Sequence, residues 1–171
     1  MFEDKEINYQ ELKLETKLNL SEDEYVMQVA DNALSLEIEL SKKPSVLRSS
    51  ELQNLHRTMG QKVDKNAGII NGLRHLPFFD KKGKRDMADG NRLIQELKLL
   101  DQQTSSLMKR AGKNPEEKLK AICTQAMRLF AIHPFNDGNK RMVKLMISNF
   151  MEKELKLKVI HQYYLIYSIP C

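Results

Sequence analysis

The stretch His133-Pro134-Phe135-Asn136-Asp137-Gly138-Asn139-Lys140-Arg141 (residues 133–141) separates two segments whose apolar residues recur with the period of a helix. The first segment begins at Asn114-Pro115, an N-cap residue followed by proline at the first helical position, and it ends where Pro134 interrupts the pattern. Its predicted core face comprises Leu119, Ile122, Cys123, Ala126 and Phe130. The second segment repeats apolar residues at Val143, Met146, Ile147 and Phe150. Residues 133–141 are therefore predicted to form a short loop between two buried helices.

Another helix is predicted far upstream, from Ser21 to about Leu40. Ser21 and Glu24 have the spacing of an S-x-x-E capping box, which satisfies free N–H groups of a first helical turn. Pro44 disfavours helix just before it, so the helix is expected to end near Leu40. Its predicted buried side comprises Val26, Ala30, Ala33 and Leu34.

Two more helices are predicted between this one and Asn114. One presents Leu52, Leu55 and Met59 on a single face and has Gly60 near its end. The other runs from about Asp89 towards Ala111, and its apolar face is formed by Leu93, Leu97 and Leu100.

The helical period fails elsewhere in the chain. From Asn66 to Asp89, turn residues separate short apolar runs, so a short hairpin or an ordered loop is predicted. Residues 1–20 form a loosely assigned N-terminal arm, and the alternation over 155–160 predicts a brief strand.

The composition favours one helical domain. The 171 residues correspond to about one domain of typical size. Hydrophobic residues make up 41% and charged residues 30% of the chain, with 7 Gly and 5 Pro, which excludes collagen-like, low-complexity and wholly disordered classes. Residues that favour helices outnumber those that favour strands. The predicted fold class is all-α.

The sequence predicts a cytoplasmic protein without membrane contact. No stretch reaches the roughly 18 uncharged residues that a bilayer span needs, and the first residues lack a basic segment followed by an apolar one. Cys123 and Cys171 suggest neither a disulfide framework nor a metal site, and they are interpreted as a packed thiol and a tail thiol. The 28 Lys and Arg against 23 Asp and Glu give a net charge of +5, which suits a nucleotide as well as a nucleic acid. Because the basic run 81–85 fits a solvated hairpin, nucleic acid is not the expected partner.

Residues 133–141 gather groups that suit phosphate chemistry at the start of a helix. Such a helix end binds anions through its free N–H groups and the positive end of its dipole. Gly138 lets a phosphate approach the backbone, and Arg141 can neutralise phosphate charge through two hydrogen bonds. Asp137 can hold Mg²⁺ together with phosphate oxygens, and His133 can take a proton from an attacking hydroxyl. These are the parts of a site for phosphoryl or nucleotidyl transfer.

Taken one at a time, these residues have ordinary structural explanations. A histidine before proline commonly caps a helix, Asn-Asp-Gly-Asn is commonly a turn, and Lys-Arg is commonly solvated. Phe135 is interpreted as a core anchor that fixes the shape of the loop.

Read as one string, residues 133–141 resemble the signature H-P-F-x-D/E-G-N-G/K-R of the Fic (Fido) family. The resemblance extends from about Leu55 to Phe150, and it implies an all-helical core with a small β-hairpin flap. The whole chain would be a single Fic-type domain, with an arm over 1–20, a core over 45–154 and a tail over 155–171. Family members mostly transfer AMP from ATP to a Ser, Thr or Tyr hydroxyl of a target protein.

The resemblance also implies roles for individual residues. His133 would be the general base and Asp137 the Mg²⁺ ligand. The remaining site residues would hold the ATP phosphates: Gly138, Asn139, Lys140, Arg141 and Lys144. Residues around Leu73 to Phe79 would form the flap, which aligns the target segment as an added strand.

Two departures from the family pattern leave the reaction type open. Lys140 stands where adenylylating members have Gly. The Doc branch, which transfers the γ-phosphate instead, also has Lys at this position. Lys144 stands where a second Arg often clasps the γ-phosphate, and a lysine lacks the bidentate fork. The alternatives are therefore a Doc-like protein kinase and a non-catalytic nucleotide-binding module. Gly138, where Doc has Ala, favours adenylylation.

The family's inhibitory motif S/T-x-x-x-E-G/N has a partial match upstream. Ser35 and Glu39 fit it, whereas Leu40 occupies the last position, so an exposed pair one helical turn apart is the more ordinary interpretation. If the match holds, residues 21–40 would be an inhibitory helix on which Glu39 pairs with Lys144. An antitoxin or other inhibitory partner protein is the alternative source of restraint.

Overall fold

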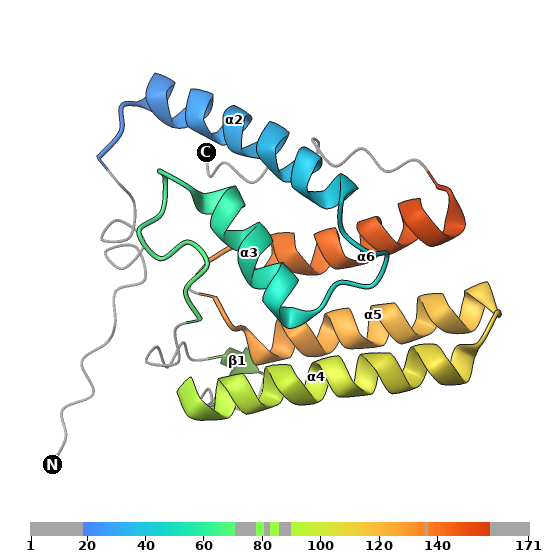
Figure 1. Ribbon diagram of the computed structural model, residues 1–171. Helices are drawn as coiled ribbons and strands as arrows, with labels where there is room; N and C mark the ends of the chain where they lie inside the picture. Colours follow the sequence, from blue (N-terminus) through green and yellow to red (C-terminus); the bar gives the residue numbers. More distant parts are fainter. Residues whose placement is uncertain (1–18, 71–77, 81–82, 86–89, 136, 158–171) are drawn as a thin grey trace, which may run out of the picture.

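The computed structural model describes residues 19–70, 78–80, 83–85, 90–135 and 137–157 (Figure 1). Its helices are α2 (Glu22–Ser41), α3 (Ser49–Gly60), α4 (Gly90–Ala111), α5 (Pro115–Ile132) and α6 (Asn139–Leu155). The prediction of a helical core is confirmed.

The helix starts predicted from local sequence are confirmed by their capping bonds. At the start of α2, Ser21 N–H donates to Glu24 Oε2 at 2.9 Å and Glu24 N–H donates to Ser21 Oγ at 3.3 Å, which completes the capping box. At the start of α5, Asn114 Oδ1 accepts from the N–H groups of Glu116 and Glu117. Because both caps are formed by neighbours in the chain, no tertiary contact is needed to specify them.

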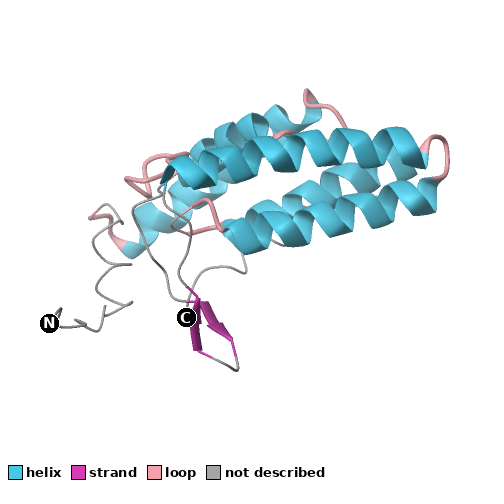
Figure 2. Cartoon of the chain, turned by 90° about the horizontal axis from the view of Figure 1, so that it is seen from below, coloured by secondary structure: helices cyan, strands magenta, loops and turns pink. Residues whose placement is uncertain are grey.

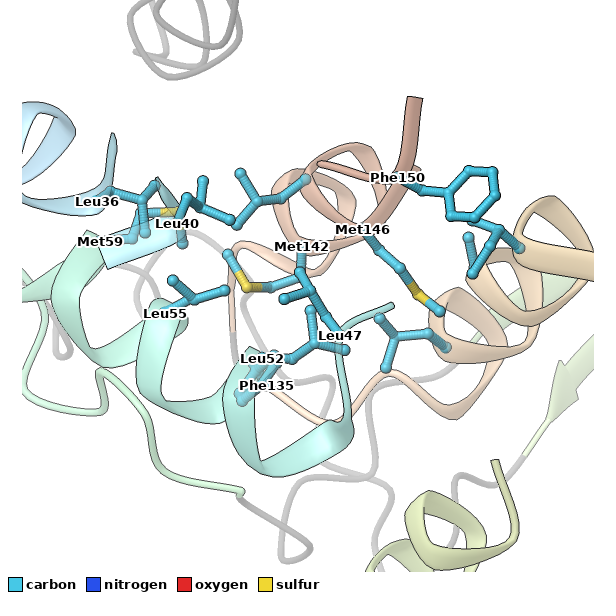
Figure 3. Close-up of a cluster of buried hydrophobic side chains, with 14 of the residues drawn as sticks. Leu36, Leu40, Leu47, Leu52, Leu55, Met59, Phe135, Met142, Met146 and Phe150 are labelled. Carbon is cyan, nitrogen blue, oxygen red and sulfur yellow. The ribbon is translucent and has the colours of Figure 1, made fainter. Parts of the chain in front are cut away.

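Helix α5 packs between α4 and α6, and α2 packs on α3 (Figure 1). Side chains of α2, α3 and α6 meet in a common cluster, which Phe135 of the loop joins (Figure 3). The side chains with the least exposure there include Leu36, Leu52, Leu55, Met142, Met146 and Phe150.

The predicted buried side of α2 is wrong in three of its four residues. Ala33 is buried, but Val26 is 47% exposed, Leu34 is 55% exposed and Ala30 is exposed. The helix carries two apolar stripes, and the one that contains Leu36 and Leu40 faces α3. A hydrogen bond from Asn32 Nδ2 to Met59 O, at 3.1 Å, joins the same face to the end of α3.

The predicted core face of α5 is also rotated from the observed one. Ile122 and Ala126 are buried as predicted, whereas Leu119, Cys123 and Phe130 are half-buried. Their places in the core are taken by Ala121, Gln125 and Leu129. On α6, Met146 and Phe150 are buried as predicted, whereas Val143 and Ile147 are half-buried beside Met142 and Leu145. A helix that packs against two neighbours buries the face that those neighbours cover. The helical period of its apolar residues alone does not identify that face.

Polar side chains tie the helix ends to distant parts of the chain. Asp101 of α4 accepts from both the N–H and the hydroxyl of Ser49 at the start of α3. Asn149 of α6 donates to Pro44 O at 2.8 Å and to Ser45 O at 3.0 Å. The Asn149 bonds hold the connection between α2 and α3 against α6, and the Asp101 bonds hold the start of α3 against α4.

A two-stranded hairpin projects from the helices (Figure 2). Strand β1 (Phe78–Asp80) pairs antiparallel with β2 (Gly83–Arg85), with Phe79 opposite Lys84. Of the predicted flap, Leu73 to Phe79, residues 73–77 lie outside the described residues, so a flap that aligns a target segment stays a prediction.

The predictions for the two ends of the chain fall mostly outside the described residues, which exclude 1–18 and 158–171. The strand predicted over 155–160 is wrong at its start, because Leu155 is the last residue of α6 and Lys156 caps the helix in the left-handed conformation. None of the helices described here combines the length and the apolar character that a bilayer span requires.

Candidate active site

His133 ends α5 in the left-handed conformation, with φ 54° and ψ 55°. Its N–H donates to Leu129 O at 3.0 Å, and its ring packs edge-on against Phe130 with centroids 6.1 Å apart. Pro134 prevents the helix from continuing, so the imidazole is carried where α5 meets the loop. Burial lowers the pKa of His133, against smaller opposing effects of a hydrogen bond to the Phe130 backbone and of the Asp137 charge. The lowered pKa favours the neutral imidazole near pH 7, which is the form that accepts a proton.

The loop is closed by Asn139, which is 4% exposed. Phe135 N–H donates to Asn139 Oδ1 at 3.0 Å, and Asn139 Nδ2 donates to Phe135 O at 2.6 Å. The structure thus places this side-chain amide on the loop backbone, where it shapes the loop. Phe135 is 3% exposed, so its predicted role as a core anchor is confirmed.

Gly138 is the N-cap of α6 and has φ +76°, a conformation that L side chains rarely adopt. A Cβ at this position would lie 2.8 Å from Met59 Cε and 3.0 Å from His56 Nε2. Both the backbone conformation and the neighbouring side chains therefore require glycine here. The first N–H groups of α6 lie beyond it and have no carbonyl one turn earlier, as at any helix start. The geometry is that of an anion site.

Asp137 lies exposed at the entrance to α6. Its Oδ1 accepts from Gly138 N–H at 2.6 Å, and its Oδ2 forms an ion pair with Arg141 at 3.2 Å. The predicted metal ligand and the predicted phosphate ligand are thus in contact with each other. A bound cation can replace Arg141 at the Asp137 carboxylate, and a bound anion can replace Asp137 at the Arg141 guanidinium.

The two predicted lysines lie on the first turns of α6. Lys140 and Lys144 are four residues apart and exposed, so they lie on one side of the helix near its N-terminus. Lys144 also makes an interaction in this structure. The structure brings all the predicted phosphate-binding residues to one helix end.

The predicted regulatory residues lie on α2. Ser35 is exposed and Glu39 is half-buried. Glu39 Oε2 accepts from Thr58 Oγ1 of α3 at 2.6 Å, and its Oε1 lies 3.5 Å from Lys43 Nζ. The pairing of Glu39 with Lys144 stays a prediction.

Sequence reasoning missed His56, a residue of α3 that is 2% exposed. Its ring stacks on Phe135 with centroids 4.0 Å apart and planes 6° apart, and its Nε2 lies 2.8 Å from Asp137 O. The available signal was its spacing, because His56 falls at i+4 in the apolar pattern that starts at Leu52. A polar residue on that stripe needs a buried partner.

Comparison with known proteins agrees with the fold and with the loop. The profile described as the Fic/DOC family matches residues 46–151, a range that contains the whole loop. No curated protein matches the chain.

Several solved structures are similar in fold. The N-terminal Fic domain of a Bep effector from Bartonella sp. AR 15-3 has a TM-score of 0.57 at 21% identity, over 81% of this chain and 68% of that one. BepC of Bartonella tribocorum, solved with AMPPNP, has a TM-score of 0.53 at 18% identity, over 75% and 67%. The Fic domain of a VirB-translocated Bep effector of Bartonella quintana, solved with ADP, has a TM-score of 0.56 at 16% identity, over 90% and 80%.

These similarities agree with the helical architecture, and the profile spans most of the chain. The loop at residues 133–141 retains every position that the family signature specifies, with Lys140 at its variable place. The chain belongs to the Fic/DOC family.

Proposed function

We propose that this protein is a protein adenylyltransferase that transfers AMP from ATP to a Ser, Thr or Tyr hydroxyl of a target protein. The observation that carries the proposal is the loop between α5 and α6, in which His133 ends α5 and a left-handed Gly138, followed by Arg141, opens the N-terminus of α6. The AMPPNP and ADP bound in two proteins of similar fold support nucleotide binding by this protein.

The proposed reaction displaces pyrophosphate from ATP. The target hydroxyl oxygen attacks the α-phosphorus, the bond from that phosphorus to the bridging oxygen of the β-phosphate breaks, and pyrophosphate leaves. His133 accepts the hydroxyl proton, which its lowered pKa permits near neutral pH. The N–H groups at the start of α6, together with Arg141, hold the negative charge of the phosphates.

Asp137 is the residue that fits a magnesium ion in this site. Its carboxylate is 51% exposed at the helix entrance. No group of three or more His, Cys, Asp or Glu that could hold a metal was found among the described residues, so the remaining ligands would be phosphate oxygens and water. Bound there, Mg²⁺ would neutralise developing phosphate charge. The ion pair between Asp137 and Arg141 suits this role, because magnesium can replace Arg141 at Asp137 while phosphate replaces Asp137 at Arg141.

The position of the label in ATP tests the reaction type. The purified protein is incubated with Mg²⁺ and a bacterial lysate, in parallel with α-labelled and with γ-labelled ATP. Protein-bound label is expected from the α position alone. Label from the γ position alone would replace adenylylation by the phosphate transfer that Lys140 suggests. Nucleotide binding without any transfer would favour a non-catalytic module.

The regulatory part of the proposal rests on Glu39. If its carboxylate pairs with Lys144 and takes the place of the γ-phosphate, Glu39→Ala should raise the initial rate of transfer several-fold at saturating ATP. The partly exposed ion pair with Lys43 contributes only about 0–1 kcal/mol, but loss of the hydrogen bond from Thr58 Oγ1 should lower the free energy of unfolding by about 1.5–3 kcal/mol. Glu37→Ala on the same helix is the matched control. Equal rates for the two variants would leave Glu39 as a structural residue between α2 and α3.

A further inference from the structure

We infer that His56 is a positioning residue, which orients the Asp137–Gly138 peptide of the active-site loop through one tautomer of its imidazole. This inference rests on the proposed function for its kinetic consequences, but its geometry stands independently. The side chain is buried between α3 and the loop and stacks on Phe135.

The tautomer follows from the two partners of the ring. Gly68 N–H donates to Nδ1 at 2.9 Å, so Nδ1 carries no proton. The other partner, at 2.8 Å from Nε2, is the carbonyl oxygen of Asp137, which can only accept. The proton therefore resides on Nε2, and His56 connects two backbone segments as an acceptor at one end and a donor at the other.

The bond to Asp137 O determines the direction of the next N–H group. In a trans peptide the C=O and the N–H point to opposite sides. With the carbonyl of the Asp137–Gly138 peptide directed at His56, its N–H is directed away, and there it donates to Asp137 Oδ1. His56 thus orients the Asp137–Gly138 peptide at the start of α6. The N–H of that peptide in turn holds the Asp137 carboxylate, which is proposed to bind magnesium.

The ring has no space in which to reorient. On one side Phe135 stacks at 4.0 Å, and on another Gly138 approaches so closely that a Cβ would lie 3.0 Å from Nε2. Turning the ring over would place carbon atoms at both hydrogen-bonding positions and leave Asp137 O and Gly68 N–H without their bonds. The stacked ring is therefore a rigid spacer between α3 and the loop.

The second end of the spacer is a glycine in the left-handed conformation, and both of its polar groups are bonded. Gly68 has φ +73°, and a Cβ there would lie 2.6 Å from Arg57 Cβ. Its carbonyl accepts from Gln53 Nε2 at 2.8 Å. Both polar groups of this residue are thus bonded to α3 side chains, and its N–H bond to Nδ1 is the one that fixes the tautomer of His56.

Two substitutions separate the ends of the spacer. His56→Gln can place an amide N–H group near the position of Nε2 and keep a donor to Asp137 O. His56→Asn has a shorter amide, whose oxygen can accept from Gly68 N–H but whose donor does not reach Asp137. Both remove the aromatic ring, so both are expected to lower the melting temperature by a similar amount. Gln53→Ala is the matched control, because it loosens Gly68 without touching the loop.

The expected readout is a difference between the two variants beyond stability. His56→Asn should weaken ADP binding, measured by calorimetry, and reduce kcat of transfer, each by about tenfold to hundredfold, as for loss of a buried hydrogen bond. His56→Gln should stay within about tenfold of the unsubstituted protein in both, and Gln53→Ala should match that protein in ADP affinity. Equal losses in the Asn and Gln variants, or no loss in either, would overturn the positioning role.

A spectroscopic measurement tests the tautomer without any activity. Heteronuclear NMR of protein with isotope-labelled histidine, with the His56 signals assigned by their loss in His56→Gln, should show a protonated Nε2 and an unprotonated Nδ1. The opposite tautomer or an imidazolium would contradict the inference. If the protein transfers no label from ATP, the proposed function fails, whereas the tautomer and the ADP affinities still decide the role of His56.

Discussion

His133→Ala is expected to lower the rate of transfer by at least about 100-fold, the loss typical of removing a general base, while ATP still binds. Among the titratable side-chain types in residues 133–141, only imidazole has an ordinary pKa near neutrality. Burial lowers that pKa and so keeps the proton-accepting form available. The anion site formed by the start of α6 does not include this side chain, so nucleotide affinity should survive. Rates come from labelled ATP and affinities from calorimetry on the same preparation.

The matched control is His133→Asn. Residue 133 has φ 54°, and asparagine tolerates this left-handed conformation better than alanine. The two variants should therefore differ slightly in stability but lose the same factor in rate. A variant that kept the original rate with bound ATP would exclude His133 as the base and favour the non-catalytic module.

Gly138→Ala is expected to destabilise the fold and to abolish nucleotide binding. A residue with a Cβ in the left-handed conformation costs about 1–2 kcal/mol. The close approach adds about 1–3 kcal/mol of overpacking, because the added Cβ would lie 3.0 Å from Nε2 of the stacked His56 ring. The flexible end of Met59, at 2.8 Å, can move away more easily. Displacement of the loop would then misplace the N–H groups proposed for the phosphates.

Gly112→Ala is the control that isolates the close approach. Gly112 also has a positive φ, +57°, but a Cβ there would meet nothing within 4 Å. Chemical denaturation should therefore show only the conformational loss of about 1–2 kcal/mol for this variant, with ADP affinity unchanged. If the two alanine variants lost the same stability, the contact of Gly138 with His56 would have no energetic weight.

Local signals in the sequence predicted the helix ends well. The capping box of Ser21 and Glu24, the Asn114-Pro115 start and the stop before Pro134 all appear where expected. Each of these signals involves residues within four positions of one another, and their bonds form in the same way whatever packs around them.

The active-site loop was predictable for the same reason. Residues 133–141 contain the helix stop, the glycine and the helix start in one continuous string, so the helix end proposed to bind phosphate forms from adjacent residues. Even the closure of the loop by Asn139 on Phe135 spans only four positions.

Only the tertiary structure decided which faces of the helices are buried and what supports the loop. On α2 apolar residues occupy more than one side of the helix, and packing on α3 buries the side with Leu36 and Leu40. His56 reaches Asp137 across 81 positions of the chain, a pairing that no local pattern encodes. Turns and caps are specified by short-range sterics and hydrogen bonds, so the sequence by itself determined them. The family signature is likewise a continuous string that the sequence alone contains. Burial and cross-chain bonds depend on which surfaces meet, so they follow from the packing of all the helices at once.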